Sequence, residues 1–189
     1  MRQSLRRATI ALVVFLRGVN VGGHRVFRPA QLPAKVPQLG LLNIGAAGTF
    51  IVRRRVPRTT VRTLLSRQLP FAAAIVICEG AQIRRLVEDN PLAAYAARRD
   101  VTRFVSILGG APDAEPVLPL EFRDGRRWLV RIVGRQECFV VGLYRRHMKT
   151  IGYLGRVDRL FDVPITTRNW NTIIAVAREL EGGARAASN

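Results

Sequence analysis

The stretch TIALVVFL, Thr9 to Leu16, is an unbroken apolar run in which β-branched residues are frequent. A strand that is covered on both faces has this pattern, because neither of its faces meets water. Arg6 and Arg7 precede the run as in an export signal, but Arg17 stops it at once and no small-x-small cleavage pattern follows. It is also too short to cross a bilayer. We therefore expect a buried first strand in a cytoplasmic protein with no membrane partner.

The segments after this run predict further helices and strands. A glycine-rich turn follows it, and the weak helical spacing after the turn is interrupted by Pro33 and Pro37, which should shorten any helix there. The next segments predict a hairpin, a helix capped by Thr59 or Thr60, and a second buried strand: Leu41 to Ile44 with Thr49 to Arg53, the helix bearing Val61, Leu64, Leu65 and Leu69, and Phe71 to Cys78. The first 78 residues thus predict the order β-α-β-β-α-β, which is typical of a ferredoxin-like unit.

The second half shows a less regular version of this order. Asp124-Gly125 between two alternating runs is a strong hairpin signal. The expected elements are a helix bearing Ile83, Leu86 and Val87, a strand Val101 to Leu108, the hairpin Leu118 to Phe122 with Trp128 to Ile132, a strand Cys138 to Leu143, a helix from Ile151 to Phe161, and a last helix from Trp170 to Leu180. The predicted fold class is therefore α+β, with two ferredoxin-like units in one compact chain, the second degenerate. Residues 1–78 form the first unit and 79–182 the second, and residues 183–189 form a disordered tail.

The net charge of +18 and the pI near 11.7 are the most unusual property of the composition. A chain of this charge is drawn to polyanions at low salt. All the positive side chains except Lys35 and Lys149 are arginines, which a GC-rich genome would also produce, so function and codon usage both remain explanations. Cys78 and Cys138 lie far apart and have no metal-ligand spacing, so we expect reduced core thiols, no metal and no cofactor.

Two motifs resemble a known family. Phe15 to Gly23 is similar to an opening L-L-R-G-I-N-V-G-G, and Thr167 to Thr172 is similar to a closing R-N-W-N-T, of the bacterial family catalogued as domain of unknown function 1697. Asn90-Pro91 also stands where members have an Asn-Pro pair, so the resemblance runs from about Ile10 to Leu180. It implies two ferredoxin-like units and assigns no activity. Members tend to have S-G-N where this chain has Ala47-Gly48-Thr49.

The two motifs also suggest an anion site. Glycines in the turn allow its N–H groups to converge on an anion, and a helix N-terminus favours phosphate or carboxylate. If the motifs meet in space, the candidate ligand-binding residues are Arg17, Asn20, Gly22, Gly23, His24, Arg168, Asn169 and Asn171. The alternative is structural, because the turn can serve packing and Thr166, Thr167 or Asn169 can cap the last helix. His24 is the one general base near a motif, and no catalytic residue is assigned.

Nucleic acid is the other candidate partner. Val14 to Val19 is similar to the RNP2 strand of RNA-recognition motifs, but no RNP1 pattern accompanies it, which favours a core position for Phe15. Arginine clusters would contact phosphates if they lie on one face: Arg53, Arg54, Arg55, Arg145 and Arg146. Our first hypothesis is a non-enzymatic, polyanion-binding protein. An enzyme or sensor for a small phosphorylated or carboxylated ligand and a protein-interaction module are the alternatives, and the oligomeric state stays open.

Overall fold

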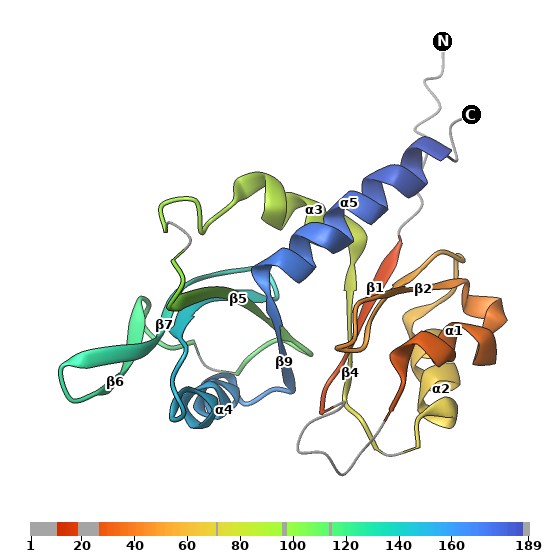
Figure 1. Ribbon diagram of the computed structural model, residues 1–189. Helices are drawn as coiled ribbons and strands as arrows, with labels where there is room; N and C mark the ends of the chain where they lie inside the picture. Colours follow the sequence, from red (N-terminus) through yellow and green to blue (C-terminus); the bar gives the residue numbers. More distant parts are fainter. Residues whose placement is uncertain (1–10, 19–26, 71, 96–97, 114, 187–189) are drawn as a thin grey trace.

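A computed structural model describes residues 11–18, 27–70, 72–95, 98–113 and 115–186. It is a mixed α+β fold with two antiparallel sheets (Figure 1). The first sheet has the strand order β2-β3-β1-β4, in which β1 is Leu12–Leu16, β2 is Leu41–Ile44, β3 is Thr49–Val52 and β4 is Ile75–Glu79. Every residue of β1 is buried, which confirms the strand that the apolar run predicts.

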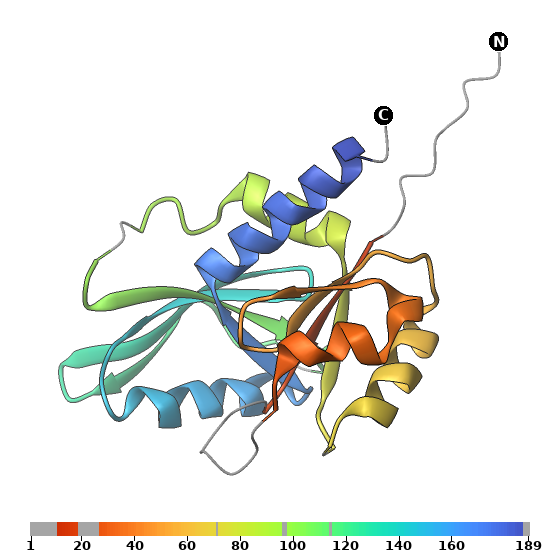
Figure 2. The same ribbon diagram turned by 45° about the vertical axis from the view of Figure 1, so that its right-hand side comes forward.

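Helices cover the outer face of this first sheet (Figures 1 and 2). The proline-rich segment forms a 3-10 turn at Pro29–Gln31, the short helix α1 at Leu32–Lys35 and a second 3-10 turn at Pro37–Leu39, so the prolines shorten the helix as expected. Helix α2 spans Arg58–Gln68 and begins after Pro57, whose side chain makes no capping hydrogen bond. The predicted cap at Thr59 or Thr60 is therefore wrong. Pro57 already has the extended φ and ψ that a residue before a helix needs.

The second sheet has the order β6-β7-β8-β5-β9. Its strands are β5 at Val101–Leu108, β6 at Leu120–Asp124, β7 at Arg127–Gln136, β8 at Phe139–Arg145 and β9 at Ile165–Asn169. The accompanying helices are α3 at Gly80–Asp89, α4 at Thr150–Phe161 and α5 at Trp170–Ala186. Helix α4 packs on the outer face of this sheet (Figure 2). Asn90 ends α3 in the left-handed region, directly before Pro91.

Two expectations for the end of the chain need correction. Thr166 and Thr167 do not cap the last helix, because they lie in β9, which pairs with β5. Threonine is β-branched and suits a strand, and the Thr167 and Ser106 hydroxyls bond at 2.7 Å across the two strands. Helix α5 also continues through Ala186, and so includes the first residues of the predicted tail. Alanine and arginine there favour helix.

A central hydrophobic core joins the two sheets. It combines one face of β1, β3 and β4 with residues of β5 and β8, and the apolar sides of α3 and α5 close it. Figure 1 shows α5 lying beside α3 and extending from the second sheet toward the first. The outer faces of the two sheets have separate cores, with α1 and α2 in one and α4 in the other. Within the described residues, no helix is long and apolar enough to span a membrane.

Candidate functional site

The two sequence motifs meet at the side chain of Arg168. This arginine lies on β9, and its side chain is directed into the contact between β9 and the first sheet, where only 8% of the residue is exposed. Its Nη2 donates to the main-chain oxygens of Leu16 and Ala47, both at 2.7 Å. Its Nε donates to Thr49 Oγ1 at 2.9 Å. Arg168 thus connects the end of β1 and the β2–β3 turn to the second sheet.

All the donors of this guanidinium bond protein oxygens. Nη1 donates to Thr166 Oγ1 at 2.8 Å and to the main-chain oxygen of Thr167 at 2.9 Å. With the bonds of Nε and Nη2, each of its five N–H groups has an acceptor. An anion could bind Arg168 directly only by replacing some of these bonds. The contact therefore has the geometry of a structural connection between the sheets.

The charge of Arg168 is balanced by neutral groups. Its guanidinium lies 5.7 Å from the centre of the Phe15 ring, and the described part of the chain supplies it with no carboxylate partner. Burial lowers the pKa of Arg168 to about 10. Carbonyl dipoles and the face of an aromatic ring therefore stabilise a buried cation at this junction. Phe15 is fully buried, which confirms its position in the core.

Most other residues of the closing motif have structural roles. Asn169 immediately precedes α5, and its Oδ1 accepts the main-chain N–H of Asn171 at 2.9 Å, as in a helix N-cap. Trp170 is 3% exposed and packs in the central core. The side chain of Asn171 is exposed. Unlike Arg168 and Asn169, the candidate ligand residue Asn171 has a side chain with no structural role in the described contacts.

The opening motif is described in part. Arg17 and Gly18 follow β1 and are exposed, and Gly18 has a φ of +73°, a value that favours glycine. The main-chain N–H of Arg17 donates to the oxygen of Ala74 at 2.9 Å, which extends the pairing of β1 with β4. The other predicted ligand residues of this motif lie outside the described residues: Asn20, Gly22, Gly23 and His24.

The predicted nucleic-acid contacts do not form one cluster. Arg53, Arg54 and Arg55 lie between β3 and α2 in the first half, whereas Arg145 and Arg146 lie between β8 and α4. Both ribbon views place these two segments at opposite sides of the molecule (Figures 1 and 2). The arginines therefore belong to two separate positive regions, which differ in the number of carboxylates around them.

The region in the second half is neutralised in part, because Asp100 and Glu121 each pair with two arginines. Arg145 pairs with Asp100, and its guanidinium lies 4.4 Å from the centre of the Trp128 ring. Arg131 lies on the same ring at 4.8 Å and pairs with Glu121. Carboxylates therefore accompany the arginines of this sheet.

Carboxylates are absent from the first half. Residues 1–78 contain 13 lysines and arginines and no aspartate or glutamate, so the remaining 18 cations and all 13 carboxylates lie after Cys78. Arg53 and Arg58 pair with Glu179 and Glu79 from beyond that point. Six further exposed cations have no carboxylate within 4.0 Å among the described residues: Arg28, Lys35, Arg54, Arg55, Arg62 and Arg67.

Metal and thiol chemistry find little support in the described residues. No three histidines, cysteines, aspartates or glutamates gather there as a metal site requires. Cys78 and Cys138 are both free, one buried and the other half-buried. Burial raises the pKa of both thiols, that of Cys138 to about 11, so neither is an activated nucleophile.

Comparison with known proteins agrees with the opening motif. Residues 10–136 match the model of the family described as "Protein of unknown function (DUF1697)". The chain belongs to this family. The match ends before the closing motif, which therefore rests on its own resemblance to family sequences.

Structural comparison extends over nearly the whole chain of this DUF1697 member. It is similar to the conserved bacterial protein SP0830 from Streptococcus pneumoniae, with a TM-score of 0.55 and 16% sequence identity. The likeness covers 92% of this chain and 99% of that one. At this identity the likeness shows a shared fold and no shared activity. No curated protein matches the chain in sequence.

Proposed function

We propose that this DUF1697 member is a non-enzymatic binder of polyanions, in particular of nucleic acid, and that it binds through its first half. The distribution of carboxylates carries this proposal. Codon usage can replace lysine by arginine throughout a chain, but it does not remove every aspartate and glutamate from 78 consecutive residues. A surface without carboxylates of its own has a positive potential, which Glu179 and Glu79 cancel in part through their pairs with Arg53 and Arg58.

The positions of these cations also support the proposal. Arg54 and Arg55 follow β3, Lys35 ends α1, and Arg62 and Arg67 belong to α2. These segments lie on or beside the helical layer that covers the first sheet (Figure 1). Phosphates along a nucleic-acid backbone can contact several such side chains at once, and each contact releases counterions.

The first experiment is fluorescence anisotropy with single- and double-stranded DNA and RNA over a salt series. A triple variant with Lys35→Gln, Arg54→Gln and Arg55→Gln removes three charges from the first half. A matched variant with Arg126→Gln, Arg127→Gln and Arg146→Gln removes three from the second. We expect the first variant to lower the salt slope by roughly one for each lost phosphate contact, and the second to change it much less.

Two results would contradict the proposal. If the two triple variants change the salt slope equally, binding depends on the net charge alone and not on the first half. Complete loss of binding at about 150 mM salt, with no preference for one form of nucleic acid, would mean that the charge is a general coat.

A second candidate is an enzyme or sensor that holds a small phosphorylated or carboxylated ligand between the Arg17–His24 turn and the Arg168–Thr172 segment. The 2.7 Å bond from Arg168 to the Leu16 oxygen favours it, because the two motifs are then neighbours. The donors of Arg168 are engaged, so the test uses Asn171, whose side chain is exposed. Calorimetric titration with inorganic phosphate, in the wild type and in Asn171→Ala, tests this candidate. Equal affinities would argue against it.

We also infer that each sheet belongs to a ferredoxin-like unit, with the boundary near Cys78. The order β2-β3-β1-β4 in the first sheet is matched by β7-β8-β5-β9 in the second, strand for strand in chain order. In the second unit, strand β6 stands where the first helix would be expected. This substitution accounts for a repeat that is degenerate in sequence.

A further inference from the structure

Two large apolar side chains project into water where β8 leads into α4. Met148 is 93% exposed and Ile151 is 81% exposed. Among the described residues, Val117 is the one other large apolar residue with comparable exposure. Apolar residues that are exposed singly are common on protein surfaces, but neighbouring ones form a patch, and a patch of this kind marks a contact surface.

The chain that carries these two side chains is held firmly in place. Thr150 lies between them and is only 3% exposed, and its Oγ1 donates to the main-chain oxygen of Arg145 at 2.7 Å. The Nζ of Lys149 donates to both carboxylate oxygens of Asp124, at 2.9 and 3.0 Å. The apolar pair is therefore presented outward by an ordered segment, which lowers the entropy that is lost when a partner binds.

Exposed arginines border the apolar pair. The β6–β7 turn lies beside the start of α4, since Lys149 bonds Asp124 and the hydroxyl of Tyr153 donates to the main-chain oxygen of Arg123 at 3.0 Å. Figure 2 shows this hairpin and the start of α4 at the same end of the molecule. Three exposed arginines there have no carboxylate within 4.0 Å among the described residues: Arg126, Arg127 and Arg146.

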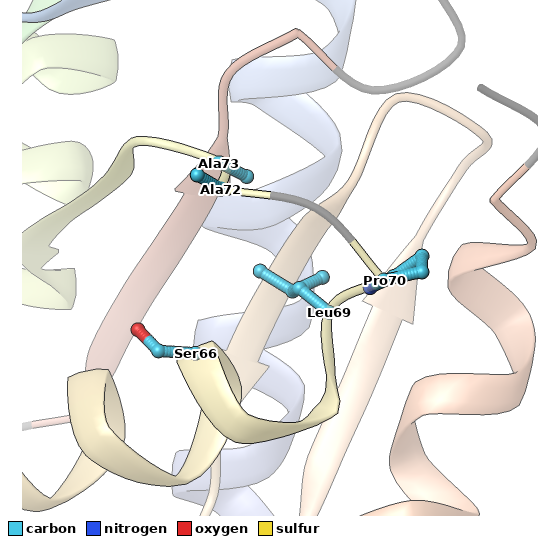
Figure 3. A pocket seen from close by; sticks show the side chains of 5 residues that line it. All are labelled: Ser66, Leu69, Pro70, Ala72 and Ala73. Carbon is cyan, nitrogen blue, oxygen red and sulfur yellow. The ribbon is translucent and has the colours of Figure 1, made fainter. Parts of the chain in front are cut away.

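The shape of the patch restricts what can cover it. Side chains with these exposures project from the surface and line no groove. Two open hollows of the described surface lie in the first half, next to α2, and Figure 3 shows the larger one, lined by Ser66, Leu69, Pro70, Ala72 and Ala73. The patch itself is convex, so its partner must accept inserted side chains. The interface of a lipid bilayer is fluid and does so without a preformed pocket.

The charge around the patch favours one kind of partner. A second copy of this chain would place like charges opposite each other, which opposes association. A membrane that contains anionic lipids offers phosphates to the arginines and an apolar layer to the side chains between them. Each arginine close to such a surface contributes to binding, and so does each apolar group that enters the layer.

We propose that Met148 and Ile151 insert into the headgroup layer of an anionic membrane, while Arg126, Arg127 and Arg146 contact lipid phosphates. The sequence predicts no membrane partner because its first apolar run is too short to cross a bilayer, but a contact with one face of the bilayer needs no spanning segment. The inference goes beyond the polyanion binding of the first half and does not depend on it.

The first test removes the apolar side chains without changing any charge. A double variant with Met148→Ser and Ile151→Ser is compared with Val117→Ser, which alters an equally exposed apolar residue elsewhere. Binding is measured by co-sedimentation with vesicles of phosphatidylcholine and phosphatidylglycerol at about 150 mM salt, where long-range attraction is screened. We expect the double variant to bind at least about tenfold more weakly than the wild type, and Val117→Ser to bind equally well.

A second measurement distinguishes insertion from adsorption by charge. Met148→Cys and Val117→Cys each introduce an exposed thiol for a polarity-sensitive dye, whereas Cys78 and Cys138 are buried and half-buried. On addition of the vesicles, the emission of the dye should shift to shorter wavelength at position 148 and stay unchanged at position 117. The triple variant of Lys35, Arg54 and Arg55 should still bind the vesicles, which separates this surface from the proposed nucleic-acid surface.

Three results would overturn the inference. Equal vesicle binding by the double variant and the wild type, with no shift at position 148, would mean that charge alone adsorbs the protein. Failure of the wild type to bind the vesicles would leave nucleic-acid binding unaffected but would exclude a membrane at this patch. A dimer in sedimentation velocity that the double variant abolishes would assign the patch to a second copy of the chain. Circular dichroism of each variant establishes that it is folded.

Discussion

Arg168 shows how one side chain can hold two sheets together. Removing its positive charge from water costs free energy. Hydrogen bonds to the oxygens of Leu16, Ala47 and Thr49 offset this cost. Hydrogen bonds to charged groups are worth more than neutral ones, and an unmade bond in a buried place is costly. The stability of the junction therefore depends on this residue.

Replacing Arg168 by methionine should destabilise the protein. Arg168→Met keeps a long side chain but removes every donor, so the free energy of unfolding should fall by about 3 kcal/mol. Urea denaturation followed by circular dichroism measures this change. Arg159→Met, at an exposed position of α4, is the control and should change stability by less than about 0.5 kcal/mol. A loss below about 1 kcal/mol in Arg168→Met would contradict the role assigned to the guanidinium.

Cys138 should react slowly with thiol reagents. Burial raises its pKa from 9.0 to about 11, so the reactive thiolate at pH 8 is about 100-fold scarcer than in an unperturbed cysteine. Alkylation by iodoacetamide at pH 8, followed by mass spectrometry, measures the rate. A peptide of residues 135–141 serves as the unfolded reference. Rates within about fivefold of each other would show that Cys138 is more accessible than its burial indicates.

At the scale of elements, the sequence pattern determines helix α5, whereas a contact between distant segments determines the strand β9 before it. The periodicity of Trp170, Ile173, Ile174, Ala177 and Leu180 predicted this helix, and it is present. Strand β9 was not predicted, because Ile165–Asn169 has too few apolar residues to show an alternating pattern. Its pairing with β5 creates the strand, and this is a contact between segments about 60 residues apart.

The cap of α5 can be tested directly. Asn169→Ala removes the oxygen that accepts the Asn171 N–H, and should lower the free energy of unfolding by about 1 kcal/mol. Thermal unfolding measures the difference. Asn171→Ala is the matched control, because its main-chain N–H is retained and its side chain is exposed. If the two variants are equally stable, the Asn169 side chain does not act as a cap.

At the scale of the whole molecule, the central core is shared between the two halves. Val13 and Phe15 of the first sheet and Val105 and Val141 of the second belong to the same buried cluster, which α3 and α5 complete. The first 78 residues include neither helix, so one face of the first sheet would be open to water in isolation. The two units are therefore expected to depend on each other for stability.

Unfolding of the full chain should accordingly be a single cooperative transition. A fragment of residues 1–78 should show no cooperative unfolding in urea, because the inner face of its sheet lacks a partner. Circular dichroism and the fluorescence of a bound hydrophobic dye follow the unfolding of the fragment and of the full chain under the same conditions. A fragment that unfolds with a sharp transition of its own would show that the first unit is an autonomous domain.

The sequence by itself determined the α+β class, most strands and helices, the family and the excess of positive charge. These properties follow from local patterns, since apolar periodicity, proline and glycine act within a few residues. The absence of carboxylates before Glu79 is also a property of the sequence alone.

Only the tertiary structure decided that Arg168 serves as a connection between sheets and that the arginine clusters lie apart. The physical reason is the same for both. Each depends on which segments distant in the chain come into contact, and burial, hydrogen bonding and the local balance of charge are properties of those contacts rather than of the residues alone.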